Sequence, residues 1–484
     1  MTSEYLQFSS IPSGAHKGKH HIIIVGAGII GVCTAYYLTR HPAFDPATHH
    51  ITIIESKRVA GGASGKAGGL LALWAFPQQI VPMSFQLHQE LSSEYNGEEE
   101  WAYRRLTTVS IEGNIEKELK DNDSLDDSDA SSILSSHKLE DEMAANGHTS
   151  DATTVASNEN IDSVDPYGCK DATKPTDRPS KIKVVQKNSI KNEHFSLTHG
   201  ELPNNLKWIK PGIIRDWSYL GDMDSTAQVH PYKFTNFILK KAMEVGGVEL
   251  VLGKVNEILY DEETGATNGV SYDVSSVKTQ AKETTVPIEL HGNQIVLSVG
   301  PWTSKILPDC PISGLRAHSI TIAPDRGQVS PYAIFTELAI GQDQYISPEI
   351  YARKDEVYVC GEGDTLVDVP ETTDDVEVVK EKCDILFEYV GTLSPNLQNG
   401  RILKRQACYL PVLDVPSSSG PLIGETNVEN LFLASGHSCW GINNAPGTGK
   451  IMAELLLDGV VECADISALD PSLFFDASVL NFTA

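Results

Sequence analysis

The chain has 484 residues, of which 40% are hydrophobic, and it carries a formal net charge of −27. A chain of this length favours two packed domains over a single small core. The acidic charge excludes functions that need a basic surface, such as binding the phosphate backbone of nucleic acids. No stretch reaches the roughly 18 to 20 apolar residues of a membrane span, and residues 1–20 lack the apolar core of a secretory signal. We therefore expect a cytoplasmic protein without an integral membrane span.

The eight cysteines are spread along the chain, with no Cys-x-x-Cys pair among them. No local group of cysteines and histidines has the spacing of zinc ligands. We expect neither a metal site nor structural disulfides.

Near the N-terminus, residues 20–25 (HHIIIV) form an apolar, β-branched run that predicts a buried strand. Residues 29–40 predict a packed helix, and residues 51–54 predict a second buried strand. Between the first strand and the helix, residues 26–31 read GAGIIG, which is the pattern G-x-G-x-x-G. This strand, glycine turn and helix predict a dinucleotide-binding βαβ unit.

Each glycine of the pattern has its own physical role. Gly26 permits the tight turn, Gly28 lets the backbone approach a pyrophosphate, and Gly31 lets the helix pack on the strand. Glu55 ends the second strand and is suited to hydrogen-bond the adenosine ribose, while its charge disfavours the 2′-phosphate of NADP. The fingerprint alone leaves NAD and FAD open.

The next segment, residues 61–70, reads GGASGKAGGL and is too rich in small residues to act as a packing element. Such a run lets the backbone lie against a ligand and donate several N–H groups. It extends the predicted cofactor site beyond the nucleotide half.

Residues 113–198 change abruptly to Asp, Ser, Asn, Lys and Thr with few aromatic residues. A segment of this composition cannot bury enough apolar surface to offset its chain entropy. We expect an acidic, partly disordered insertion. A docking segment for a protein partner, regulated by phosphorylation of its serines, is the alternative.

Globular patterns return after the insertion. Residues 231–245 predict an amphipathic helix, and residues 294–299 predict a buried strand that stops at Gly300. Between about residues 315 and 370, short β-like runs alternate with turns, which indicates a largely antiparallel sheet. Near the C-terminus, residues 431–434 predict a strand, followed by a glycine turn at 435–437 and a helix that begins near Thr448.

The Gly-Ala-Ser…Ala-Gly run at 61–70, the QIVLSVGPWTS segment at 294–304 and the GPLIGE…ASGHSCWGINNAPGTGK segment at 420–450 together resemble the D-amino-acid oxidase and sarcosine oxidase (DAO) superfamily of FAD-dependent oxidoreductases. The whole is similar to a fungal branch of oxidoreductases in that superfamily. The resemblance covers both ends and the middle of the chain, but not the insertion. It implies FAD as the cofactor, because the closing segment reaches the flavin ring in the family.

Fingerprint and resemblance together give the predicted cofactor-binding residues. They are Gly26, Gly28, Ile29, Ile30, Gly31, Glu55, Ser56, Ala63, Ser64, Lys66, Ala67, Gly68, Val255, Gly300, Trp302, Cys408, Gly436, His437, Gly441 and Ile442. Noncovalent FAD is favoured. Cys408 falls where the sarcosine oxidase branch attaches flavin through a thioether, so covalent attachment is the alternative.

On the substrate side, no acid and base pair has a convincing spacing, and the catalytic residues stay open. Tyr351 and Arg353 alternate along a predicted strand, so that Arg353 is a candidate to hold a substrate carboxylate, although an exposed edge pair gives the same pattern. Trp440 is a candidate wall of the flavin site. Amino-acid oxidases of the family carry an arginine just before the proline in the position of Leu410, and its loss argues against an ordinary α-amino acid as substrate.

The expected fold is an α/β (α+β overall) arrangement: a Rossmann-like FAD-binding domain of the glutathione-reductase type interleaved with a mainly antiparallel substrate domain. Residues 20–85, 225–312 and 400–470 are assigned to the FAD-binding domain. Residues 86–112, 199–224 and 313–399 are assigned to the substrate domain.

The expected function is oxidation of a C–N bond in a small amine or amino-acid-like substrate by hydride transfer to flavin N5. The alternative is an FAD-binding protein with a regulatory or scaffold role, such as in endosomal membrane trafficking, peripheral to that membrane. A plain NAD dehydrogenase is the third possibility, and the closing segment at 420–450 argues against it.

Overall fold

The computed structural model describes residues 7–120, 201–274, 287–418 and 420–478. The chain divides into a large unit, Met1–Ile115 with His194–Ala484, and a small unit, Glu116–Glu193. Nearly all of the small unit, including the predicted acidic insertion from residue 121 onward, lies outside the described residues. The fold below is that of the large unit.

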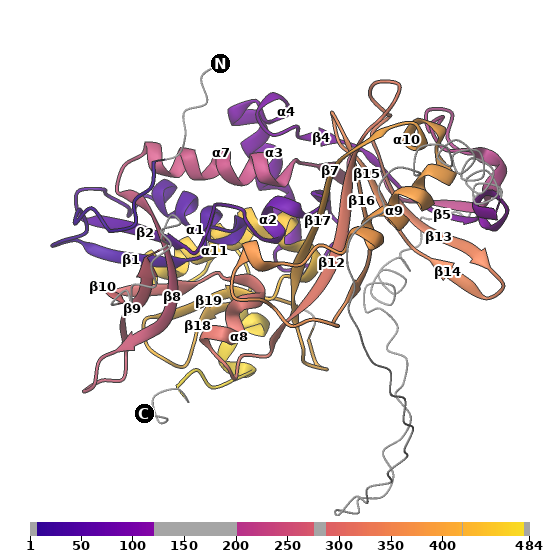
Figure 1. The fold of residues 1–484 in the computed structure, drawn as a ribbon. Helices are drawn as coiled ribbons and strands as arrows, with labels where there is room; N and C mark the ends of the chain where they lie inside the picture. Colours follow the sequence, from indigo (N-terminus) through magenta and orange to yellow (C-terminus); the bar gives the residue numbers. More distant parts are fainter. Residues whose placement is uncertain (1–6, 121–200, 275–286, 419, 479–484) are drawn as a thin grey trace, which may run out of the picture. The chain divides into compact units, whose positions relative to one another are not determined.

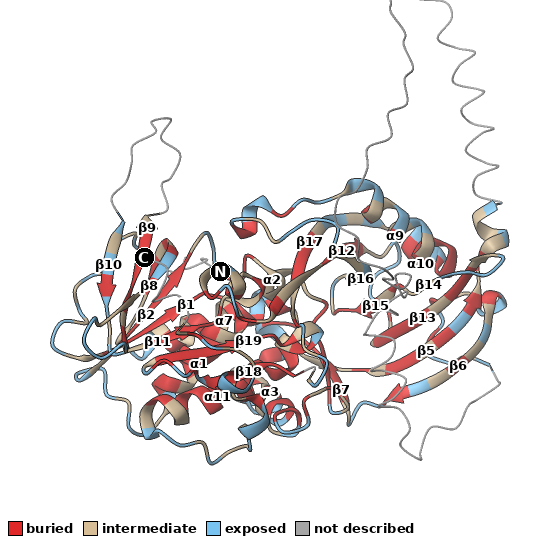
Figure 2. Cartoon of the chain, turned by 90° about the horizontal axis from the view of Figure 1, so that it is seen from below, coloured by how far each residue is buried: buried red, intermediate tan, exposed pale blue. Residues whose placement is uncertain are grey.

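The first sheet is built on the predicted βαβ unit. Strand β1 (His20–Val25) pairs in parallel with β2 (His49–Glu55) and with β11 (Gln294–Leu297). The complete order is β10-β9-β8-β2-β1-β11-β19-β18, in which β19 spans Leu431–Ser435 and β18 spans Leu422–Glu425. The central strands β1, β11 and β19 are largely buried (Figure 2). Apolar runs such as HHIIIV belong in such strands, because both faces of a parallel sheet are covered.

One face of this sheet packs against helices. Ile22 and Ile24 of β1 join the core formed by α1 (Ile29–Arg40), α7 (Pro231–Glu244), α11 (Gly441–Asp458) and α3 (Val81–Tyr95). Figure 1 shows α1 and α11 alongside each other, and α7 above them. The sequence predictions of a helix at 29–40 and of an amphipathic helix at 231–245 are confirmed to within one residue.

The other face packs against a β-hairpin extension. Strand β8 (Val248–Tyr260) pairs with β2 and then continues antiparallel to β9 (Thr267–Val274), which pairs with β10 (Ile288–His291). Ile23 and Val25 of β1 join this second core. Strand β8 runs without interruption through Gly253.

The second sheet is predominantly antiparallel, as the sequence predicted. Its order is β17-β12-β16-β15-β13-β5-β6, with β14 (Gln344–Ile346) paired to β13. The strands are β17 (Arg401–Leu413), β12 (Ile312–Ala323), β16 (Val357–Asp364), β15 (Glu349–Ala352), β13 (Tyr332–Gly341), β5 (Thr107–Asn114) and β6 (Ile214–Gly221). Helices α9 (Lys380–Leu393) and α10 (Pro395–Gln398) follow β16 in the chain.

The remaining elements of this part of the chain are short. A short sheet has the order β3-β7-β4, made of β3 (Leu70–Ala72), β7 (Thr226–Gln228) and β4 (Arg104–Arg105). The short helices are α2 (Ala63–Lys66), α4 (Gly97–Glu100) and α8 (Thr303–Ile306).

The predicted fold class is confirmed, and the division into domains remains a prediction with one correction. Residues 401–413 were grouped with the FAD-binding pieces, but β17 pairs along its length with β12 in the second sheet. Leu410 and Pro411, near the end of β17, therefore belong to the second sheet.

The prediction that the last helix begins near Thr448 is wrong, because α11 begins at Gly441 with Pro446 inside it. A proline has no N–H and would leave the carbonyl of Ile442, four residues earlier, without its helical partner. Two buried side chains of α3 form hydrogen bonds in place of those that the helix lacks here. His88 Nε2 donates to Ile442 O at 2.8 Å, and Ser84 Oγ donates to Asn443 O at 2.7 Å while it accepts from Gly447 N at 2.9 Å.

Candidate cofactor site

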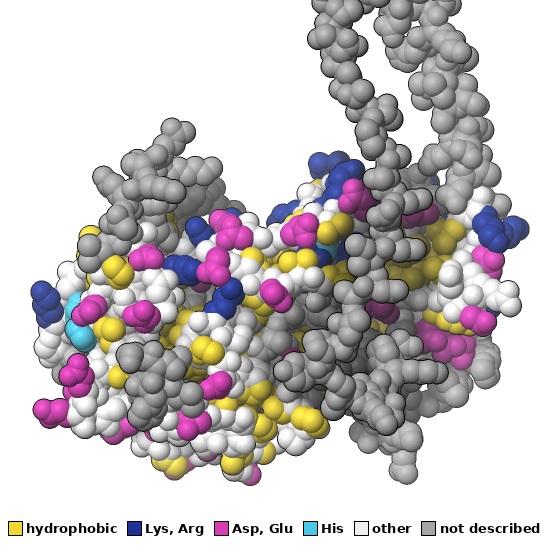
Figure 3. Space-filling view, turned by 60° about the horizontal axis from the view of Figure 1, so that its bottom comes forward, with side chains coloured by type: hydrophobic (Ala, Val, Ile, Leu, Met, Phe, Trp, Pro, Cys, Tyr) yellow, Lys and Arg dark blue, Asp and Glu magenta, His cyan; other side chains and the backbone are white. Residues whose placement is uncertain are grey.

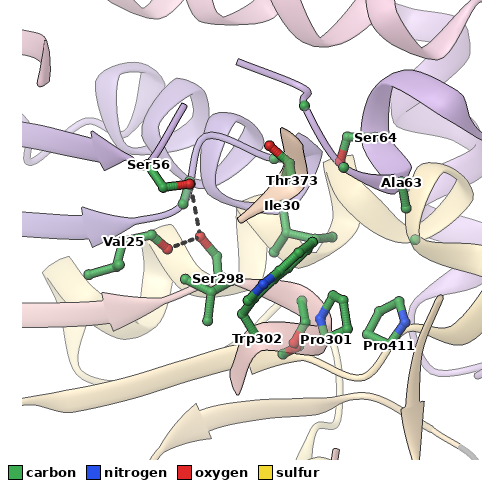
Figure 4. A pocket seen from close by; sticks show the side chains of 18 of the residues that line it. Val25, Ile30, Ser56, Ala63, Ser64, Ser298, Pro301, Trp302, Thr373 and Pro411 are labelled. Atoms are coloured by element: carbon green, nitrogen blue, oxygen red, sulfur yellow. Dashed lines mark hydrogen bonds between the residues drawn. The ribbon is translucent and has the colours of Figure 1, made fainter. Parts of the chain in front are cut away.

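A cavity of about 520 Å³ lies at the carboxyl ends of the parallel strands. Binding crevices occur at this edge of α/β sheets. Among the predicted cofactor residues, fifteen line the cavity: Gly26, Gly28, Ile29, Ile30, Glu55, Ser56, Ala63, Ser64, Ala67, Val255, Gly300, Trp302, His437, Gly441 and Ile442. Figure 4 shows Ile30, Ala63 and Ser64 on one side of it and Trp302 with Pro301 and Pro411 on the other.

The glycine fingerprint has the geometry that its pattern predicts. Gly26 has a φ of +101°, and a Cβ there would lie 2.7 Å from Ser298 O. A Cβ on Gly31 would lie 2.2 Å from Gly26 O, so only glycine allows this contact between turn and helix. Gly28 differs, because a Cβ there would meet only Ser64 Oγ, at 3.2 Å. Its backbone is therefore open to the cavity.

The start of α1 forms the part of the wall suited to a pyrophosphate. Ile29 and Ile30 begin the helix, where backbone N–H groups point outward and the helix dipole favours an anion. The Ser64 hydroxyl accepts a hydrogen bond from Ile29 N at 2.8 Å, which fixes the 61–67 segment against this helix end.

The nucleoside part of the wall carries Glu55, Ser56 and Val255. The Glu55 side chain is buried, and its carboxylate accepts hydrogen bonds from Ala27 N and Lys57 N, each at 3.0 Å. It thereby fixes the glycine turn. The ribose contact expected of Glu55 stays a prediction.

Sequence reasoning missed a loop that reaches the cavity from the second sheet. Glu371 and Thr373 of this loop line the cavity, and Glu371 accepts from Lys254 Nζ at 2.5 Å and from Lys305 Nζ at 2.7 Å. These hydrogen bonds lower the pKa of Glu371 to about 2. Trp302 Nε1 donates to Pro370 O at 2.6 Å, so a predicted cofactor residue also holds the loop. No motif marks this loop, because its partners lie 66 to 117 residues away in the sequence.

The far end of the cavity is lined by His437, Cys439, Gly441 and Ile442, from the segment that the resemblance places near flavin, and by Leu410. His437 is buried and hydrogen-bonded to Thr448 Oγ1 at 3.0 Å. Burial lowers the pKa of His437 to about 3, so the imidazole is neutral near pH 7.

Five predicted cofactor residues do not line the cavity: Gly31, Lys66, Gly68, Cys408 and Gly436. Lys66 Nζ donates to Ala407 O at 3.0 Å, so it ties α2 to β17. Gly68 packs under a ring, since a Cβ there would lie 2.2 Å from Tyr351 Cδ2. Cys408 is buried, and burial raises the pKa of its thiol to about 11. Gly436 supplies a turn with φ of +83°.

The substrate-side candidates Tyr351, Arg353 and Trp440 are all buried, so the interpretation as an exposed edge pair is wrong for Tyr351 and Arg353. Arg353 donates through its guanidinium to Ala67 O, to Gly68 O and to Glu356. These contacts hold the Gly-rich segment in place.

Within the described ranges, no helix is long and apolar enough to cross a membrane, and no group of three His, Cys, Asp or Glu side chains could hold a metal ion. The face drawn in Figure 3 intersperses Lys and Arg side chains with Asp and Glu side chains.

Residues 21–158 and 195–455 match the family described as FAD dependent oxidoreductase (DAO). The chain belongs to this family. The DAO chain is 52% identical to the Saccharomyces cerevisiae protein named "Putative oxidoreductase TDA3". The match covers 98% of each of the two chains. The DAO chain is 32% identical to "Putative oxidoreductase C1F5.03c" of Schizosaccharomyces pombe, over 94% and 98% of the two chains.

Among solved structures, the DAO chain is similar to glycine oxidase from Bacillus cereus, with a TM-score of 0.59 and 18% identity over 92% of this chain and 96% of that one. This likeness supports the fold.

The cavity of this DAO chain fits the family's cofactor. Its wall includes a glycine turn too tightly packed for a Cβ, a helix N-terminus suited to the phosphates and the buried Glu55 carboxylate at the nucleoside part. The cavity continues from there to the closing segment at 437–442. An NAD dehydrogenase has no need of that closing segment. The chain is an FAD-dependent oxidoreductase of the DAO family.

Proposed function

We propose that the protein oxidises a C–N bond in a small primary or secondary amine by hydride transfer to noncovalently bound FAD. The observation that carries the proposal is the continuity of the cavity from Glu55 to His437 and Cys439. A protein that kept FAD only as a structural element would need the nucleotide half alone. Here the walls at both halves are preserved.

The substrate end favours an amine over an ordinary α-amino acid. Leu410 lines the cavity at the position where amino-acid oxidases of the family carry an arginine for the substrate carboxylate. Arg353, the other candidate for that carboxylate, is occupied by Ala67 O, Gly68 O and Glu356. A carboxylate group would therefore meet an apolar side chain instead of a guanidinium.

In this mechanism the protein orients the reactants, and FAD supplies the hydride acceptor. His437 lines the cavity and is hydrogen-bonded to Thr448 in α11, and because burial lowers its pKa to about 3 it is a weak base, so we assign it a positioning role. The apolar side chains of Leu410, Pro411 and Ile442 line this part of the cavity and offer no polar group to the reacting C–N bond.

Turnover is tested directly with a panel of primary and secondary amines. The purified protein is incubated with each amine in air, and the carbonyl compound released on hydrolysis of the imine product is quantified. We expect release with at least one amine, and heat-denatured protein is the control. Full FAD occupancy without product from any amine would favour the scaffold role. Neither the comparisons nor the described residues support the endosomal association named with that alternative.

The surroundings of Cys408 support noncovalent attachment. Its thiol is buried, lies outside the cavity wall, and has a pKa raised to about 11, whereas a thioether requires a reactive thiolate facing the flavin. We therefore predict that acid precipitation releases the yellow colour into the supernatant, and that Cys408→Ala binds FAD like the parent protein. A yellow pellet that turns colourless in Cys408→Ala would show a covalent bond.

A further inference from the structure

An acidic side chain that no motif marks lies on the face of the second sheet turned toward the cofactor site. Glu349 begins β15 and pairs with Cys360 of β16 and with Phe335 of β13. Tyr351, two residues further along the strand, has its side chain on the same face. The Tyr351 ring packs on Gly68, so this face meets the Gly-rich segment.

The carboxylate of Glu349 is held by neutral groups. Tyr351 Oη donates to Glu349 Oε2, and Cys360 Sγ lies 3.8 Å from the same oxygen. Within the described part of the chain, no Lys, Arg or His pairs with Glu349. Desolvation raises the pKa of Glu349, yet the side chain keeps partial exposure. An enclosed carboxylate without a cation is costly, and a positively charged ligand beside it would remove that cost.

A row of aromatic rings leads from Tyr351, the hydrogen-bond partner of Glu349, to Trp440 at the start of α11. Tyr351 contacts Phe335, with 6.0 Å between ring centroids, Phe335 contacts Trp74 at 6.1 Å, and Trp74 contacts Trp440 at 5.4 Å. All three contacts are edge-on. Rings in such positions stabilise organic cations through their faces.

The row of aromatic rings reaches the flavin end of the cavity at Trp440. Cys439 lines the cavity and keeps exposed surface next to the buried Trp440. Trp440 lies in the chain between Cys439 and Gly441, which both line the cavity. The aromatic row that starts beside Glu349 therefore ends at the cavity wall.

We propose that Glu349, oriented by Tyr351 at the end of the aromatic row Phe335, Trp74 and Trp440, binds the positively charged group of an organic ammonium substrate. The proposal rests on the proposed amine oxidation and deepens it. It assigns the substrate class as cationic amines without a carboxylate. In this proposal the Glu349 carboxylate selects a cationic group, whereas the family's arginine at the position of Leu410 selects a carboxylate.

The test uses binding, separately from turnover. The full-length FAD-bound protein is titrated with benzyltrimethylammonium, a permanent cation, and with phenylacetate, an anion of similar size, while the flavin absorption spectrum is recorded. We expect saturable spectral changes with the cation and none with the anion. Glu349→Gln should raise the Kd for the cation at least tenfold, because it removes the charge and keeps the shape.

The matched control is Glu112→Gln, which removes an exposed carboxylate from β5 of the same sheet and should leave the Kd unchanged. FAD content and the unfolding midpoint report whether each variant is folded. If Glu349→Gln loses FAD, Leu410→Arg serves as the second variant and should weaken cation binding at least tenfold by like-charge repulsion. An unchanged Kd in the folded Glu349→Gln or Leu410→Arg protein, or tighter binding of phenylacetate than of the cation, would overturn the proposal. Cation binding that depends on Glu349 in a protein that oxidises no amine would refute the proposed turnover alone.

Discussion

Replacing Gly31 with alanine is expected to give a protein that purifies without flavin. The new Cβ would lie 2.2 Å from Gly26 O and 2.5 Å from Ser298 Oγ, and both atoms belong to tightly packed strand ends. The helix α1 must then move away from β1, which displaces the helix N-terminus from the phosphate position. Overpacking of this kind costs about 1–3 kcal/mol of folding free energy. Absorbance of the purified protein in the flavin bands and its unfolding midpoint measure both effects.

Gly212 provides the matched control for this substitution. It is exposed, and a Cβ there would meet nothing within 4 Å. Gly212→Ala should therefore bind FAD like the parent protein and unfold at the same or a slightly higher temperature. A yellow Gly31→Ala protein with the parent's FAD content would contradict the assigned role of the glycine turn.

A second large effect is expected at His88, which donates a hydrogen bond to the Ile442 carbonyl that Pro446 leaves without a helical partner. His88→Leu removes the donor to the Ile442 carbonyl, and a buried acceptor without a partner costs about 1–3 kcal/mol. His88→Gln keeps an N–H donor in nearly the same place and should recover much of this loss. Urea unfolding of the three proteins at pH 7.5 compares them.

The free energy of unfolding should also depend on pH through His88. Burial lowers the pKa of His88 to about 4, below its ordinary value of 6.5, so the unfolded chain binds a proton in this window that the folded protein does not. Stability is therefore complete above about pH 6.5 and falls as the pH drops toward 4, by roughly 3 kcal/mol for a shift of this size.

The variant His88→Gln has no group to titrate at this site. Its unfolding free energy should decline less steeply between pH 6.5 and 4 than that of the parent protein. The other buried histidines, such as His21 and His437, contribute equally to both proteins. Equal pH slopes for the two proteins would contradict the buried neutral state of His88.

The start of α11 shows where sequence reasoning stops. Pro446 and the glycines around it are typical of a turn, so the sequence predicted a helix only from Thr448. The side chains that permit an earlier start, Ser84 and His88, lie about 360 residues away in the chain. No local pattern could reveal them. In contrast, the βαβ unit at 20–55 was predictable, because its strands, helix and glycine turn are adjacent in sequence.

The cofactor site likewise contains residues that local motifs predicted and residues that only tertiary contacts bring to the cavity. Most of the predicted motif residues, between Gly26 and Ala67 and between His437 and Ile442, line the cavity, whereas Gly31 and Lys66 do not. Glu371 and Thr373 were missed because their loop reaches the cavity only through tertiary contacts. Glu349 was missed because a glutamate at the start of an alternating strand reads as a solvent-facing residue. Its pairing with Cys360 and its bond from Tyr351 become visible only in the folded sheet.

The central claim, oxidation of an amine by the bound flavin, is tested most directly by anaerobic reduction. The purified yellow protein is mixed with each amine of the panel in the absence of oxygen, and its absorbance in the flavin bands is followed. We predict that at least one cationic amine without a carboxylate bleaches the flavin and that admission of air restores the colour. A protein with full FAD occupancy that no amine bleaches would contradict the account.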